Sequence, residues 1–246
     1  MKSARLCMLL VAAGVAARAD FNCTMVRKSN GNTDSTTKYY LKGQRMMTEN
    51  AFRIVILNFD AKTNTIIDKI KKTYAVYPLK PEPAPAGNSI TNAQFSIRET
   101  GQHRTIEGFN ASQAIMTGDV DMGKALGGLK IEFEIEIWYS PDVPGAKEMH
   151  DFHQRNKDLF PWAALAGGGS TGMGRAMADM QKQMSFINGV PVLQITHVKP
   201  MEGDPKITGP MVAALDGTSV EMGGFSSSPI PDSVFAIPAG YTQVAH

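Results

Sequence analysis

The segment from Lys130 to Tyr139 alternates strictly between two kinds of side chain, and this alternation constrains the fold more than any other feature of the sequence. Successive side chains of a strand point to opposite sides of a sheet, so the pattern predicts a strand with one buried and one solvated face. The predicted buried face consists of Ile131, Phe133, Ile135, Ile137 and Tyr139. The opposite face carries three glutamates, which we interpret as a solvated surface rather than a metal or acid–base site.

Short β-rich segments separated by turn residues occur along most of the remaining chain. They recur about every ten residues, which is typical of a barrel or a sandwich. Besides the strand above, we expect strands at 21–28, 37–49, 52–59, 66–67, 73–77, 93–99, 104–107, 111–117, 191–198, 219–225 and 234–237. The sequence therefore predicts a mainly β chain, and we expect a single domain.

A helical insert is expected at about 144–187, between two β-rich parts. Met149, Phe152, Leu159 and Phe160 have helical spacing, and a glycine-rich break follows at 167–172. A second helix is expected at 173–186, with methionines at 173, 177, 180 and 184 along one stripe. Methionine fills irregular gaps, so this stripe indicates either ordinary core packing or an adaptable wall for an apolar ligand. Beside a glycine hinge it would also suit a movable lid.

The first nineteen residues have the features of a secretory signal peptide. Lys2 and Arg5 precede a short apolar run, and Ala17 and Ala19 occupy the small-residue positions before the expected cleavage site. The remaining chain, 20–246, has nearly equal numbers of basic and acidic residues, which gives no reason to expect nucleic acid as a partner. No later segment is long and apolar enough to predict a transmembrane helix. We therefore expect a periplasmic or secreted protein in which Cys23 is a lone, buried thiol.

Two motifs suggest chemistry, and neither is favoured. His150 and His153 lie three apart on the first expected helix and could both reach one Zn²⁺, but no third ligand is indicated. Residues 168–172 match the G-x-S-x-G pattern around Ser170, but no strand precedes them, as a nucleophile elbow requires. We therefore expect no catalytic residues, no metal and no cofactor, and a hydrolase that uses Ser170 is only a minor alternative.

Four short motifs resemble a family. They are Thr73–Val76, Trp138–Pro144, Gly189–Val192 and Val234–Tyr241. Together they are similar to a secreted bacterial domain of unknown function, domain 4412, which itself resembles the outer-membrane lipoprotein carrier superfamily. The resemblance implies a twisted antiparallel half-barrel, covered by two or so helices, with an apolar cavity between them. It brings no catalytic residues, and the Gly- and Met-rich insert departs from the carriers.

From these observations we expect an exported, non-enzymatic protein that binds a lipid or a lipoprotein acyl chain between the half-barrel and a Met-rich helical lid. The expected cavity residues are Ile131, Phe133, Ile135, Ile137, Tyr139, Trp162, Met173, Met177, Met180 and Met184. The alternative is a structural or interaction module of the cell envelope with a filled core and no ligand. The sequence does not name the ligand or the oligomeric state.

The first testable prediction concerns export. Cleavage should follow Ala19, because Ala17 and Ala19 fit the small-residue rule of the signal peptidase. The intact mass of the exported protein measures this directly. A mature species that retains residues 1–19 would contradict both the cleavage site and the expected compartment.

Overall fold

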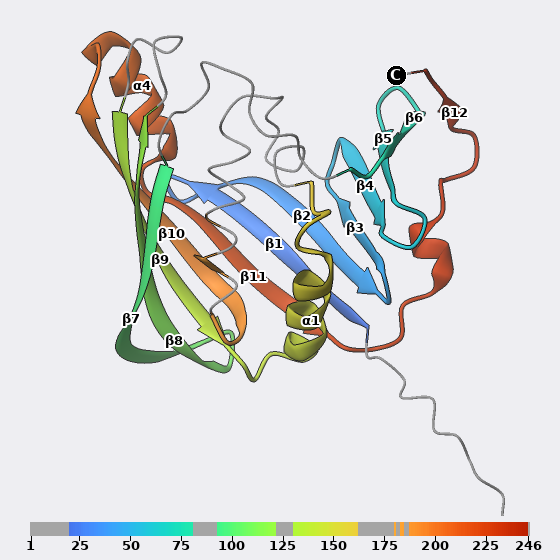
Figure 1. Cartoon of the computed structure of the whole chain (residues 1–246), viewed down its shortest axis with the longest axis horizontal. Coiled ribbons are helices and arrows are strands. Elements are labelled where there is room, and N and C mark those ends of the chain that lie inside the picture. Colours follow the sequence, from blue (N-terminus) through green and yellow to red (C-terminus); the bar gives the residue numbers. More distant parts are fainter. Residues whose placement is uncertain are drawn as a thin grey trace, which may run out of the picture.

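The computed structural model describes residues 20–80, 93–121, 130–161, 180, 183–184 and 187–245. Its dominant element is one twelve-stranded sheet in the order β12-β6-β5-β4-β3-β2-β1-β11-β10-β9-β8-β7 (Figure 1). The strands are β1 (Phe21–Ser29), β2 (Asn32–Lys42), β3 (Arg45–Glu49), β4 (Arg53–Asn58), β5 (Thr63–Asp68), β6 (Thr73–Pro78), β7 (Ala93–Ile106), β8 (Phe109–Asp121), β9 (Lys130–Ser140), β10 (Val190–Glu202), β11 (Thr218–Ser226) and β12 (Thr242–Gln243). Neighbouring strands are antiparallel, except that β12 runs parallel to β6.

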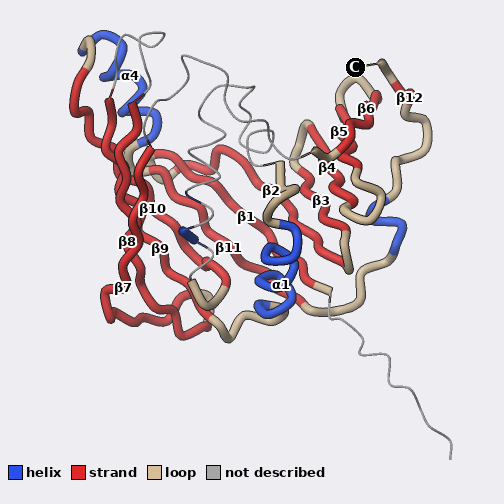
Figure 2. The backbone as a smooth tube through the Cα atoms, viewed as in Figure 1, coloured by secondary structure: helices blue, strands red, loops and turns tan. Residues whose placement is uncertain are grey.

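The expected half-barrel covered by helices is wrong. The described chain is largely all-β, and β7 and β12 lie at opposite edges of an open sheet that curves without closing (Figure 2). The α-helices that lie wholly within the described ranges are α1 (Ala146–Asn156) and α4 (Pro205–Leu215), residues 180 and 183–184 are also helical, and a short 3₁₀ helix, η2, spans Asp232–Phe235. The second expected helix, at 173–186, lies mostly outside the described residues. None of the helices in the described ranges is long and apolar enough to cross a membrane.

Helix α1 lies over the concave face of the sheet (Figure 1). Gly145 precedes the helix with a φ of +79°, and a Cβ at this position would come within 2.8 Å of the Phe21 ring. Glycine therefore allows the helix to start directly against β1. The predicted apolar stripe is confirmed, because Phe152 and Phe160 are buried and Met149 packs against the same cluster.

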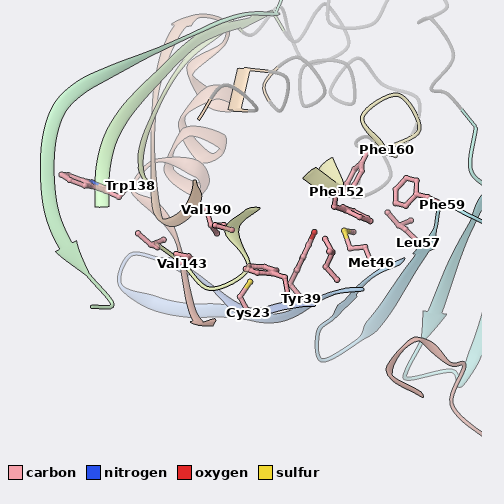
Figure 3. Packing of buried hydrophobic residues seen from close by; sticks show 14 of the residues in the cluster. Cys23, Tyr39, Met46, Leu57, Phe59, Trp138, Val143, Phe152, Phe160 and Val190 are labelled. Carbon is pink, nitrogen blue, oxygen red and sulfur yellow. The ribbon is translucent and has the colours of Figure 1, made fainter. Parts of the chain in front are cut away.

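The cluster beneath α1 joins the helix to strands β1 to β4. Figure 3 shows Tyr39, Met46 and Leu57 near Phe152 and Phe160, while Trp138 lies apart on β9. The ring of Phe59 meets Phe152 edge-on at 5.3 Å between centroids and stacks on Phe160 at 5.6 Å. The aromatic residues thus form the contact that holds α1 on the sheet.

The alternation predicted for β9 is confirmed on its apolar face, where Ile131, Ile137 and Tyr139 are buried. The opposite face is not wholly solvated, because Trp138 is also buried. The Arg104 guanidinium, on β7, lies over the indole at 4.0 Å from the ring centroid. A cation over the indole face is a favourable contact, so β7 helps to cover this position.

The C-terminal part differs from the sequence analysis at two places. Residues 234–237 do not form a strand, because η2 occupies Asp232–Phe235. Helix α4 was not expected at all, although Pro205 stands in its first turn and the Asp204 carboxylate accepts a hydrogen bond from the Lys206 amide at 2.9 Å. Proline and aspartate at these positions are ordinary helix-start signals.

The stability contribution of α1 can be tested at Phe152. The side chain is fully buried between Phe59 and Phe160, so Phe152→Ala should lower the free energy of unfolding by about 3–5 kcal/mol. The control is Phe52→Ala, because Phe52 is exposed and should change stability by less than about 0.5 kcal/mol. Urea unfolding measures both, and equal effects would contradict the packing.

Candidate functional site

The outer face of β2 to β6, opposite to α1, is covered by the C-terminal segment. Met47, Ile54, Ile56 and Ile67 are buried on this face, and the partly buried residues packed against them include Val234, Phe235 and Tyr241. We call residues 229–245, which contain η2 and β12, the C-terminal strap. The strap explains why the adjacent residues Met46 and Met47 are both buried: one faces α1 and the other faces the strap.

The strap is anchored near both ends. At its start, the Ile230 amide donates a hydrogen bond to the Asp20 carboxylate at 2.6 Å. The Asp232 carboxylate then pairs with Arg45 at 2.6 Å and with Lys42 at 3.2 Å, and these cations hold the pKa of Asp232 below its usual range. At its other end, β12 pairs with β6, where the Thr242 amide donates to the Lys72 carbonyl at 3.1 Å.

Between these anchors, a shallow cavity of about 280 Å³ lies between the strap and the sheet and is open to solvent. Its lining combines the outer face of β2 to β4 with the middle of the strap. The lining residues are Tyr40, Met47, Glu49, Ile54, Ser233, Val234, Ala236, Ile237 and Pro238. The Glu49 carboxylate is engaged by the Lys69 ammonium at 2.7 Å. The site is therefore mainly apolar with few polar groups, as small-molecule sites generally are.

This site was not found by sequence reasoning, although a signal was present. The runs Met46-Met47 and Ile54-Val55-Ile56-Leu57 are continuously apolar, whereas a strand with one solvated face alternates. Continuous apolar runs indicate that both faces of β3 and β4 are covered.

The sequence-predicted cavity residues that the structure describes fall into two clusters. Ile137 and Tyr139 are buried in one cluster with Ile187, and Ile135, Met180 and Met184 pack against it. The Tyr139 hydroxyl donates to Glu99 at 2.7 Å, and burial together with this carboxylate raises its pKa to about 12. The structure therefore brings half of the methionine stripe, two of its four members, onto the β9 face that sequence reasoning selected.

The remaining predicted residues lie elsewhere. Ile131 is buried farther along β9, in a cluster against which Phe133 and two residues of α4, Val212 and Leu215, pack. The end of β9 near Ile131 is therefore covered by α4 rather than by the methionine stripe. Three further predicted residues, Trp162, Met173 and Met177, lie outside the described residues, as does Ser170.

Three titratable side chains meet where α1 packs on β1 and β2: Cys23 and Tyr39 are buried, and His153 is half-buried. The Tyr39 hydroxyl and the His153 Nε2 lie 3.3 Å apart, and Cys23 stands directly opposite Tyr39 in the β1–β2 pairing. Burial raises the pKa of Cys23 to about 12 and also raises the pKa of Tyr39. Burial of the imidazole, with a smaller contribution from the charge of His150, lowers the pKa of His153 to about 4. All three groups are therefore neutral at pH 7, and Cys23 is not an activated nucleophile.

The two histidines of α1 have different surroundings. His153 bonds Tyr39 and lies against the Phe160 ring at 5.1 Å between centroids, while His150 is exposed. Within the described ranges, no group of three His, Cys, Asp or Glu side chains is arranged to hold a metal ion. The absence of a metal requirement stays a prediction.

Comparisons with known proteins show no family for this chain. No protein-family model matches the chain, and no curated protein matches it. One similar solved structure is PNGF-II, with a TM-score of 0.39 and 11% identity over 92% of this chain; the chain spans only 31% of that protein. Another is an uncharacterized conserved protein from Thermus thermophilus, with a TM-score of 0.43 and 8% identity over 92% of this chain and 90% of that one. Membership of the family that the sequence resembles stays a prediction.

The desolvation of the half-buried His153 imidazole predicts a pH dependence of stability. In the unfolded chain His153 should titrate near pH 6.5, whereas in the fold its pKa is about 4. The unfolded state therefore binds the proton first, so stability is complete above about pH 6.5 and falls by about 1–3 kcal/mol as the pH drops to 4. His153→Gln should remove this part of the dependence.

Urea unfolding at several pH values measures the effect. The control is His103→Gln, which makes the same substitution at an exposed histidine of β7. If the wild type and His153→Gln lose stability equally between pH 6.5 and 4, the interpretation of His153 as a desolvated neutral group is wrong.

Proposed function

We propose that the chain is an exported, non-enzymatic binding protein that holds an apolar ligand under the C-terminal strap. The cavity between the strap and β2 to β4 is the observation that carries this proposal. Its volume of about 280 Å³ is close to the lower end of small-molecule sites, about 300 Å³. Such a volume suits the end of an acyl chain or another small apolar molecule. Export rests on the signal peptide that the sequence predicts.

The composition of the cavity supports an apolar ligand. Tyr40, Met47 and Ile54 line the sheet side, and Val234 and Ile237 line the strap side. Burying apolar ligand surface against them is favourable by roughly 25 cal/mol per Å². Among the polar groups of the lining, the Glu49 carboxylate is already paired with Lys69, so an apolar ligand would not leave this charge without its partner.

A structural or interaction module without a ligand remains the second candidate, and packing on the concave face favours it. Phe152 and Phe160 fill the space over β1 to β4, and Met180 and Met184 pack against Ile137. On this interpretation the methionines are core residues, and the ligand expected at that face is absent. The strap cavity would then be an incidental gap.

The two candidates differ in their response to filling the cavity. Ala236→Trp places a large ring in the cavity from an exposed strap position, so it should weaken binding of a fluorescent fatty-acid probe at least tenfold. The thermal melt should change little, because the substituted position is exposed. The measurement is probe titration beside a melting curve.

The matched control is Ala239→Trp, which adds the same ring to an exposed strap position that does not line the cavity. Its probe binding should equal that of the wild type. If the wild type binds no probe, the ligand proposal fails and the module without a ligand takes its place. If Met184→Glu abolishes binding and Ala236→Trp does not, the ligand lies on the concave face instead.

A further inference from the structure

Two tight turns lie side by side near the β12 edge of the sheet. One joins β3 to β4 and the other joins β5 to β6, and the Lys69 amide donates a hydrogen bond to the Phe52 carbonyl at 2.9 Å. The pairing of Arg53 with Asp68 brings the two turns into register. We call residues 49–53 and 68–73 the two-turn tip.

The two-turn tip exposes two large apolar side chains. Phe52 is 69% exposed and Ile70 is 72% exposed, the highest values among the large apolar residues that the structure describes as exposed. Single exposed apolar residues need no explanation, but these two occupy adjoining turns. Both turns belong to the hairpins at the right of Figure 1, on the side of the molecule away from β7.

Ordered turns hold these side chains outward. The Asn50 side-chain oxygen accepts hydrogen bonds from the amides of Phe52 and Arg53, at 2.9 and 2.8 Å. The Asp68 carboxylate accepts from the amides of Ile70 and Lys71 in the same way, at 2.9 and 2.8 Å. Side-chain caps of this kind fix the turn conformation. The exposure of the two apolar residues is therefore part of the folded state.

The charges of the tip are mainly basic. Arg53, Lys69, Lys71 and Lys72 stand against two carboxylates, Glu49 and Asp68. Glu49 pairs with Lys69, and the Asp68 oxygen is used by the turn amides. The Asp68 carboxylate stays negatively charged and acts on Arg53 and Lys71, so the four cations and two carboxylates leave the tip with a net charge of +2, and the cations at 53, 71 and 72 are exposed. Because basic and acidic residues nearly balance over 20–246, this concentration of positive charge is local.

We propose that the two-turn tip binds the surface of an anionic lipid bilayer. Phe52 and Ile70 would enter the boundary between headgroups and acyl chains, while Arg53, Lys71 and Lys72 contact the anionic headgroups. Apolar burial and attraction of basic residues to anionic lipids together give reversible binding at a membrane surface. A bilayer suits this surface better than a peptide does, because the apolar residues project from turns instead of lining a groove.

The inference does not depend on the ligand under the strap, because Glu49 is the one tip residue that lines that cavity, and the residues proposed to contact the bilayer do not line it. The test is sedimentation of the purified chain with vesicles of phosphatidylcholine alone and of phosphatidylcholine mixed with phosphatidylglycerol. Binding should require the anionic lipid and should weaken as salt rises. Lys71→Glu reverses one charge and should weaken binding about tenfold or more, since each basic residue near the surface contributes appreciably.

The double variant Phe52→Ser, Ile70→Ser tests the apolar part of the contact. It should weaken vesicle binding about tenfold or more. The melting curve should stay nearly unchanged, because both residues are exposed. The matched controls are Met201→Ser and Lys206→Glu, an exposed apolar residue and an exposed cation distant from the tip. Both controls should bind as the wild type does.

Three results would overturn the proposal. The first is equal binding to vesicles with and without phosphatidylglycerol, and the second is unchanged binding in the tip variants. The third is tip-dependent binding to soluble polyglutamate with no binding to vesicles, which would indicate an acidic protein partner. If the chain binds no vesicles but still binds the fatty-acid probe under the strap, this inference fails and the proposed function stands.

Discussion

The pairing of β1 with β11 is the interaction on which the rest of the structure depends. It joins β1 to β6 with β7 to β11 in one sheet, through an antiparallel register that runs from Asn22 opposite Ser226 to Lys28 opposite Ser219. The Lys28 ammonium pairs with Glu221 at 2.6 Å across this junction. Because the paired residues are far apart in the sequence, forming this pairing costs chain entropy. Only the interactions of the completed sheet offset that cost.

A sheet this broad has two faces to cover, and the chain covers them with different elements. The helix α1 packs aromatic residues on the concave side of β1 to β4, whereas the strap packs on the outer side of β2 to β6. The strap starts directly after β11, so it reaches the outer face only because β11 already lies beside β1. The cavity lies between the strap and β2 to β4, and the proposed membrane contact lies at the two-turn tip.

Much of the secondary structure could be predicted from the sequence. The β9 alternation and the apolar stripe of α1 were recognisable because each repeats with the period of its own element. The start signals of α4 were overlooked, although Asp204 and Pro205 carry them. The strand expected at 234–237 was wrong, because apolar and β-branched residues there pack on the sheet from a 3₁₀ turn, and short apolar runs do not distinguish these cases.

By itself the sequence determined that the chain is β-rich, that one face of β9 is apolar and that a helix follows it, since local periodicity and turn chemistry encode these features. Only the tertiary structure decided that the sheet stays open and that the strap covers its outer face. It also decided that Phe52 and Ile70 lie in adjoining turns that carry several cations. These arrangements depend on pairings between distant segments, such as Thr242 with Thr73. No local pattern encodes such pairings, because their partners are selected by burial on faces that exist only once the sheet has formed.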